Sequence, residues 1–354
     1  MEKRIGYLDA AKGIAMLIII WGHVSDYADV ISVWGSSFKL SIFFIISGFL
    51  VCRNRKAVPE KKAVLKKLFK SLMVPYLIFS LILIIVHISK NLVLYGTLVT
   101  EDNICNIYAA LTLRGISTLW FLPSMFIGRL IFELTGSYKL KVWKQCAVCI
   151  ALTAILIILS IAFGMFRKTM SVWITYPFLT FVKGITAYVF FLSGWIIGKT
   201  EQKTGVDKLT KFLCISGFIL NIILSLFNRR VDMNNFSFGI YPLMFFVCGL
   251  LGSVGLIVLL RALYSVSRIR LTELIGRNSL FFMLTHPFML KAAKKASGML
   301  IHETELTGMY YLRCFVTVVI IIIAEMIILY FWNKIISFVK NKKKRTEHSG
   351  ENIE

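Results

Sequence analysis

The amino-acid sequence predicts an all-α polytopic membrane protein, a bundle of about ten transmembrane helices with both termini in the cytoplasm. Of the 354 residues, 57% are hydrophobic and only 17% are charged, whereas about half of the residues in a typical soluble domain are apolar. The mean hydropathy is +0.76. A soluble fold could not bury this much apolar surface, and a chain with 28 Phe residues is too hydrophobic to be disordered.

The predicted spans are apolar runs that approach the length needed to cross the bilayer. A helix needs about 20 residues to cross about 30 Å of hydrocarbon. Residues 71–89 and 145–166 are uncharged over such a length, and the other runs come close to it or include a charge. In chain order the ten predicted spans are 8–28, 37–52, 71–89, 118–135, 145–166, 180–198, 212–228, 238–260, 271–290 and 312–335.

The distribution of basic residues predicts the orientation. The chain has 41 Lys and Arg residues against 18 Asp and Glu residues, a net charge of +23. Most of the basic residues lie at the two ends and in alternate connections, and the opposite loops hold far fewer. Cytoplasmic loops of membrane proteins carry such an excess, so both termini are predicted to be cytoplasmic. The positive charge therefore does not indicate a nucleic-acid partner, and none is expected.

The chain is predicted to form one transmembrane domain over residues 1–338, followed by a basic, polar, disordered cytoplasmic tail over residues 339–354. An amphipathic stretch at 104–113 is expected to lie in the membrane interface. The seven cysteines predict no disulfide framework. Cys146 and Cys149 lie in an apolar helix-length run, so packing is favoured over zinc or redox chemistry. No metal site is expected.

The first span carries an ammonium and an imidazole on one helix face. Lys12 and His23 are 11 residues apart, which is three helical turns plus about 20° and an axial separation of about 16 Å. Asp9 lies one turn before Lys12, and Asp26 lies one turn after His23, so each acid could pair with its neighbour. Ionisable groups inside spans are costly and often functional.

A purely structural interpretation of Lys12 and His23, the polar stripe of the first span, stays open. Lys12 could extend to the cytoplasmic headgroups, and His23 could be hydrogen-bonded at the outer interface. Gly13 and Gly22 favour the functional interpretation, because a helix without side chains at these positions can approach its neighbours closely.

Other charged residues inside the predicted spans could pair within their own helix or with a residue of another helix. Arg129 and Glu133 have the i, i+4 spacing of an ion pair, so a structural role is favoured. Lys183 and Glu325 have no partner within their own helices, and a contact between them is one hypothesis.

Two further residues have two interpretations each. His286, which precedes Pro287, is either a second catalytic or glycan-contacting group or a cap on a turn imposed by the proline. Trp120 is either a member of the interfacial aromatic belt or a platform for a sugar ring.

Several short segments of the chain form a recognisable set. The first is YLDAAKGIA at 7–15, followed by Gly22 and His23. The others are FFIISGFL at 43–50, VPY at 74–76, LWFL at 119–122 and IGRNSL at 275–280, with His286 beyond them. Together these segments resemble acyltransferase family 3, integral-membrane enzymes that acylate extracytoplasmic glycans, and the fucose 4-O-acetylase-like branch most of all. The family pattern is Arg, ten residues, then His, and Lys12 replaces the arginine here.

The resemblance implies that acyl-CoA, most simply acetyl-CoA, is a cytoplasmic co-substrate and that no cofactor stays bound. Many relatives carry an Arg-x-Arg pair just before the third span, where this chain has Lys67 and Lys70. Charge-assisted hydrogen bonds to the donor phosphates would contribute about 1.5–3 kcal/mol each. The residues expected to attract these phosphates are Lys12, Arg53, Arg55, Lys67 and Lys70.

The resemblance further implies O-acylation of a cell-surface or lipid-linked glycan by a multi-pass protein of the bacterial plasma membrane. His23 would act as the general base that accepts the proton of the acceptor hydroxyl. Trp120, Asn278 and His286 are candidates for the acceptor side. The alternative function is a non-catalytic transporter or flippase for a lipid-linked saccharide, in which His23 would have no chemical role.

Overall fold

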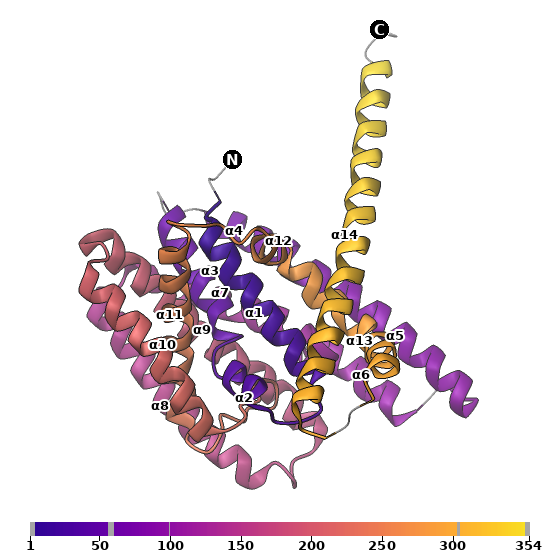
Figure 1. Cartoon of the computed structure of the whole chain (residues 1–354), viewed down its shortest axis with the longest axis horizontal. Helices are drawn as coiled ribbons and strands as arrows, with labels where there is room; N and C mark the ends of the chain where they lie inside the picture. Colours follow the sequence, from indigo (N-terminus) through magenta and orange to yellow (C-terminus); the bar gives the residue numbers. More distant parts are fainter. Residues whose placement is uncertain (1–3, 56–59, 99, 303–304, 351–354) are drawn as a thin grey trace.

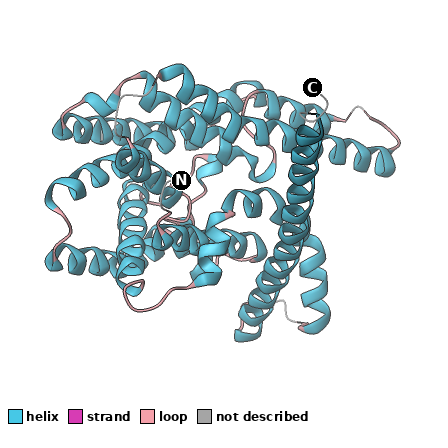
Figure 2. Ribbon diagram, turned by 90° about the horizontal axis from the view of Figure 1, so that it is seen from above, coloured by secondary structure: helices cyan, strands magenta, loops and turns pink. Residues whose placement is uncertain are grey.

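The computed structural model describes residues 4–55, 60–98, 100–302 and 305–350, and this part of the chain is helical apart from its connections. The only β-structure in these ranges is one isolated bridge between Asp232 and Ser237. The predicted all-α membrane fold is confirmed (Figures 1 and 2). The first helices are α1 (Gly6–Val24), α2 (Val30–Ser36), α3 (Ser41–Asn54), α4 (Lys61–Leu68), the π-helical η1 (Phe69–Met73), α5 (Val74–Tyr95) and α6 (Glu101–Leu111).

The second part of the chain continues the bundle. It consists of η2 (Ser117–Trp120), α7 (Phe121–Leu134), η3 (Ser137–Lys139), α8 (Val142–Phe166), α9 (Val172–Thr204), α10 (Lys208–Asn228), η4 (Met233–Asn235), α11 (Pro242–Leu263), α12 (Arg270–Arg277), α13 (Ser279–Leu300) and α14 (Gly308–Gly350). The amphipathic stretch at 104–113 lies mostly in α6, so its helical character is confirmed, and its place in the interface stays a prediction.

Within the described ranges, eight helical segments are long and apolar enough to cross a membrane. They are Gly6–Val24, Val30–Asn54, Lys61–Tyr95, Val142–Phe166, Val172–Thr204, Lys208–Asn228, Pro242–Leu263 and Gly308–Ile335. Of the ten predicted spans, 118–135 falls on η2 and the 14-residue helix α7, which is only about 21 Å long. The span 271–290 falls on α12 and α13.

The prediction of one continuous helix over 271–290 was wrong, because the chain breaks at Asn278. The Nδ2 of Asn278 donates a hydrogen bond of 2.8 Å to the carbonyl oxygen of Leu274, and a short amide side chain of this kind competes with helical hydrogen bonding. Pro287 instead lies inside α13 without ending it. A proline leaves the carbonyl four residues earlier without its helical donor, and Thr118 Oγ1 donates to that oxygen of Met283 at 3.2 Å.

Helix α1 lies at the centre of the bundle, where it contacts α2, α3, α11, α12, α13 and α14 (Figure 1). In the most apolar 18-residue stretch of α1, 61% of the residues are buried. The corresponding share in the peripheral helix α8 is 11%. The closest approach is to α12, where side chains at Gly13 or Gly276 would collide with the backbone of Thr272 or Asp9. The polar stripe of α1 therefore belongs to a helix surrounded by protein rather than by lipid.

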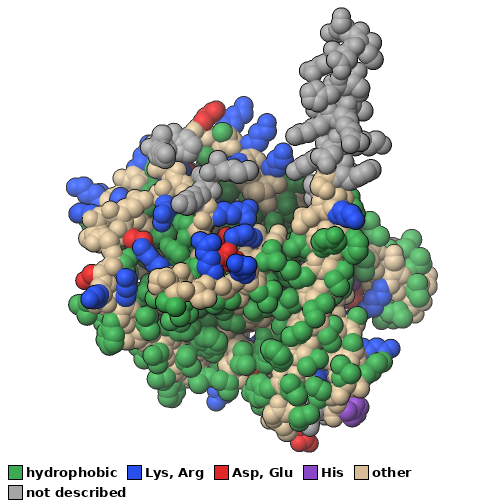
Figure 3. Space-filling view, turned by 45° about the horizontal axis from the view of Figure 1, so that its top comes forward, with side chains coloured by type: hydrophobic (Ala, Val, Ile, Leu, Met, Phe, Trp, Pro, Cys, Tyr) green, Lys and Arg blue, Asp and Glu red, His purple; other side chains and the backbone are tan. Residues whose placement is uncertain are grey.

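The beginning of α1 and the end of α14 lie on the same side of the bundle (Figure 1). Figure 3 shows Lys and Arg side chains gathered on that side, above a broad hydrophobic surface. This is the side predicted to be cytoplasmic. Helix α14 continues to Gly350, so the prediction of a disordered tail was wrong for residues 339–350, where no Gly or Pro precedes the terminal Gly350 of the helix. Residues 351–354 of that tail lie outside the described ranges.

Candidate active site

A cavity of about 220 Å³ lies at the C-terminal end of α1, on the side of the bundle opposite to the beginning of that helix. Its walls come from α1, α2, the connection to α3, η2, the beginning of α7, the segment 230–234 and α13. His23 and Trp120, two of the candidates from the sequence, both line it. Segments more than 200 residues apart therefore meet around the end of the first span.

His23 presents its imidazole to this cavity. It is the next-to-last residue of α1 and is exposed, and no hydrogen bond joins it to any residue in the described part of the chain. Its ring lies against the ring of His286, with the centroids 5.2 Å apart and an angle of 42° between the planes. An imidazole with an unoccupied nitrogen at a cavity wall can accept the proton of a bound hydroxyl.

His286 lies behind His23 rather than in the cavity wall. It is fully buried, and its Nδ1 is 2.8 Å from the carbonyl oxygen of Phe282. A carbonyl oxygen only accepts hydrogen bonds, so this contact assigns the proton to Nδ1 and leaves Nε2 with a lone pair. That Nε2 is buried and has no hydrogen-bond partner in the part of the chain that the structure describes. The structure thus places His286 against the candidate base and not at the surface of the cavity.

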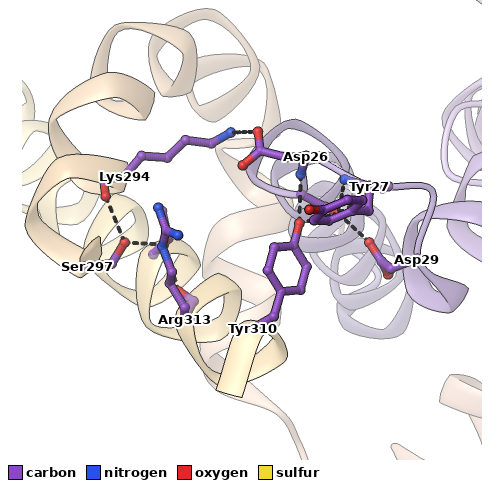
Figure 4. Close-up of polar contacts among 9 residues, drawn as sticks. Asp26, Tyr27, Asp29, Lys294, Ser297, Tyr310 and Arg313 are labelled. Carbon is purple, nitrogen blue, oxygen red and sulfur yellow. Dashed lines mark hydrogen bonds and ion pairs between the residues drawn. The ribbon is translucent and has the colours of Figure 1, made fainter. Parts of the chain in front are cut away.

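The segment after His23 is held by the carboxylate of Asp29 (Figure 4). Ser25 Oγ donates to Asp29 Oδ2 at 2.5 Å, and Trp21 Nε1 donates to Oδ1 at 3.2 Å. The backbone N–H groups of Ile31 and Ser32 donate to Oδ1 at 2.8 and 3.0 Å. Asp29 therefore ties the end of α1 to the beginning of α2, and this fixes the position of His23.

A second set of contacts joins the same segment to α13 and α14 (Figure 4). The backbone N–H of Asp26 donates to the hydroxyl of Tyr310 at 2.8 Å, and Lys294 Nζ is 2.6 Å from Asp26 Oδ1. The predicted pairing of Asp26 with His23 was wrong. Helix α1 ends at Val24, so helical i, i+3 geometry does not extend to Asp26.

Trp120 is buried, with 8% of its surface exposed, and it lines the cavity. This placement does not fit an interfacial belt. Lys183 Nζ lies 5.0 Å from the centroid of its ring and donates hydrogen bonds to the carbonyl oxygen of Arg114 and to Asn234 Oδ1, at 3.0 and 3.2 Å.

The hypothetical contact between Lys183 and Glu325 is not made. Glu325 instead accepts a hydrogen bond of 2.6 Å from the hydroxyl of Thr285, in the adjacent helix α13. Each group takes a partner from a neighbouring segment, and these tertiary neighbours have no signature in the local sequence.

The predicted ion pair of Arg129 with Glu133 is confirmed at 2.6 Å. Arg55 joins it, because its Nη2 is 2.7 and 2.6 Å from the two carboxylate oxygens of Glu133. The guanidinium of Arg55 also lies 4.1 Å from the centroid of the Tyr138 ring. Arg55 thus has an ion-pair partner inside the bundle, and its expected contact with the donor phosphates stays a prediction.

At the opposite end of α1, Lys12 Nζ is 2.7 Å from Asp9 Oδ1, which confirms the local pairing. The guanidinium of Arg277 is 3.6 Å from the other oxygen of Asp9. Lys12 does not line the cavity of His23. The structure thus places the two polar residues of the stripe on one helix without bringing them into one cavity.

The remaining donor candidates, Arg53, Lys67 and Lys70, are exposed at the ends of α3 and α4 and in η1. Asn278 lies between α12 and α13 and is not in the wall of the cavity. A surface hollow of about 630 Å³ beside α12 contributes basic groups that the sequence analysis did not single out, namely Arg268, Arg270 and Arg277.

The sequence analysis also missed two cations of the cavity itself, Lys39 and Arg230. A signal existed for Lys39, because it is a charge inside the predicted span 37–52. Arg230 lies in a predicted loop and has no comparable signal. The described residues contain no group of three or more His, Cys, Asp or Glu side chains placed to hold a metal ion.

Comparison with known proteins places this chain in a family. The model of the acyltransferase 3 family, described as an acyltransferase domain, matches residues 5–327 and thus spans all the walls of the cavity. Neither the curated proteins nor the solved structures that were compared gave a match. Because the family match covers most of the chain, this membrane protein belongs to acyltransferase family 3.

Proposed function

We propose that the protein is an O-acyltransferase of the bacterial plasma membrane that moves an acetyl group from cytoplasmic acetyl-CoA to a hydroxyl of a cell-surface or lipid-linked glycan. The observation that carries the proposal is the imidazole of His23, which has no hydrogen-bond partner among the described residues and opens into a cavity that it shares with Trp120. An acceptor hydroxyl in this cavity would meet a base, and a sugar ring would meet an aromatic wall.

The chemical step needs one proton acceptor. The hydroxyl oxygen attacks the thioester carbonyl while its proton moves to the imidazole of His23. The C–S bond then breaks, and the CoA thiolate leaves and takes up that proton from the imidazolium of His23, which restores the base. A neutral imidazole has a lone pair on one ring nitrogen, and this nitrogen can accept the proton. The buried ring of His286 would hold the imidazole of His23 in one orientation.

The donor would bind at the opposite end of α1. The exposed groups there are Arg53, Lys67 and Lys70, and the hollow beside α12 adds further arginines. The phosphates of CoA are strongly anionic, so these cations would attract them. The acetyl group would then have to pass along the part of α1 between Lys12 and His23, an axial distance of about 16 Å.

Acetyl-CoA is expected to raise the melting temperature of the detergent-solubilised protein, because a ligand that binds only the folded state stabilises it by about 2.7 kcal/mol at 100 times its Kd. The double variant Lys67→Glu, Lys70→Glu is expected to lose most of this shift. Lys211→Glu, an exposed lysine of α10, is the matched control and should keep it. A non-catalytic saccharide transporter would show no shift with acetyl-CoA in any of the proteins, and that result would refute the proposal.

His286→Ala is expected to lower kcat for acetyl transfer about 10- to 100-fold with little change in the KM for the acceptor, because His286 touches His23 and not the cavity. A lower kcat with an unchanged KM distinguishes a residue that positions His23 from one that binds the acceptor. Steady-state kinetics of the purified variant measure both constants. A selective increase in KM would instead show that His286 contacts the acceptor.

A further inference from the structure

Lys39 places an unpaired ammonium beside the candidate base. It lies in the connection between α2 and α3, is partly buried and lines the cavity. Its Nζ occupies the space left by Gly22, where a Cβ would be 2.5 Å away, and Gly22 directly precedes His23. No residue in the described ranges makes a hydrogen bond or an ion pair with this ammonium, and a partly buried charge without a partner is costly.

Arg230 supplies a second cation to the same wall. It is exposed in the connection between α10 and η4 and lines the cavity, and its guanidinium has no hydrogen bond or ion pair within the described part of the chain. Guanidinium groups bind carboxylates and phosphates with two parallel hydrogen bonds. The cavity thus holds two cations that a ligand could engage.

Asp232, which supplies the one carboxylate that the described residues place in the cavity wall, does not neutralise both cations. Its oxygens accept hydrogen bonds from the backbone N–H of Asn235 at 3.2 Å and from the side-chain amide of the same residue at 2.7 Å. Asp29 is nearby, and its oxygens are occupied by the four donors that hold the end of α1.

Two more cations lie directly behind the wall. Arg114 and Lys183 both donate to the side-chain oxygen of Asn234, which itself lines the cavity. Both cations are buried, so their charges are poorly screened by solvent. The electrostatic potential in the cavity is therefore made positive by the two cations behind the wall as well as by the two that line it.

We propose that the acceptor is an acidic saccharide whose carboxylate or phosphate group binds between Lys39 and Arg230 while one of its hydroxyls faces His23. The inference rests on the proposed function for the identity of the reaction, and it adds the class of acceptor. The anion supplies the counter-charge that the described residues do not give to Lys39, and Arg230 and Lys39 together select against neutral sugars.

Thermal stabilisation by three small saccharides tests this directly. The probes are methyl glucuronide, glucose 1-phosphate and the neutral methyl glucoside, each added to the purified protein in detergent with and without acetyl-CoA. At least one anionic saccharide is expected to raise the melting temperature, and the glucoside is not. A shift with the glucuronide alone identifies carboxylate recognition, and a shift with the phosphate alone identifies phosphate recognition.

Variants assign the effect to the two cations. Lys39→Gln and Arg230→Gln are each expected to lower the affinity for the anionic saccharide at least tenfold and to keep the shift with acetyl-CoA. Arg229→Gln is the matched control, because Arg229 is an exposed neighbour that does not line the cavity. The affinity of the unaltered protein should also fall with added salt.

Three results would overturn the proposal. They are equal stabilisation by neutral and anionic saccharides, no stabilisation by either anionic saccharide, and unchanged affinity in both cavity variants. If Lys39→Gln lowered kcat equally for neutral and acidic acceptors, Lys39 would act on the reacting carbonyl instead of selecting the acceptor. Failure of the proposed function is distinguishable, because it would remove the shift with acetyl-CoA, which none of these results requires.

Discussion

His23→Ala is expected to lower kcat for acetyl transfer by about 10²–10⁴-fold, the usual contribution of a general base. The imidazole is the only histidine side chain that lines the described cavity, and without it the acceptor hydroxyl would have to lose its proton to water. The measurement is the rate at which radiolabelled acetyl groups move from acetyl-CoA to the acceptor glycan at saturating concentrations of both.

The controls for His23→Ala separate chemistry from folding and donor binding. The variant should keep its stabilisation by acetyl-CoA, because the proposed site of the donor phosphates lies at the other end of α1. His87→Ala, in helix α5 and outside the cavity, should keep the full rate. Transfer by His23→Ala at the rate of the unaltered protein would remove the base from the mechanism and leave the transporter as the better interpretation.

Glu133→Ala is expected to destabilise the protein by about 3–5 kcal/mol. Its carboxylate accepts hydrogen bonds from both Arg55 and Arg129, and only 4% of its side chain is exposed. Removing it leaves two buried guanidinium groups without their counter-charge. Unfolding of the purified protein by a denaturing detergent measures the difference.

Glu201→Ala is the matched control, because this carboxylate forms a single ion pair with Arg261. The two side chains are 22% and 40% exposed, so water replaces the lost partner and the expected cost is below about 1 kcal/mol. If the two variants unfolded at the same denaturant concentration, the buried group of Glu133, Arg55 and Arg129 would not be a determinant of stability.

Features set by local spacing could be predicted from the sequence. The apolar runs gave the membrane fold, because only a helix of about 20 residues satisfies its own backbone across hydrocarbon. The pairs of Lys12 with Asp9 and of Arg129 with Glu133 follow from helical periodicity. The placement of His23 on the polar stripe of α1 has the same origin.

Features set by tertiary neighbours could not be predicted. Asp26 pairs with Lys294, which is 268 residues away, and Arg55 joins Glu133 across 78 residues. The break at Asn278 depends on one side-chain hydrogen bond that competes with the helix. The walls of the cavity combine parts of six helical elements with two connections, so its positive charge was visible only once the chain was folded.

The most direct test of the central claim, that an acyl group passes through the bundle to an acceptor in the cavity of His23, uses sealed proteoliposomes. Labelled acetyl-CoA is trapped inside or added outside, and surface glycan from cells that lack this chain is supplied outside. Acetylated glycan is expected only when the donor and the acceptor are on opposite sides of the membrane, and not with His23→Ala. Product formed only when both substrates are on the same side would contradict the account.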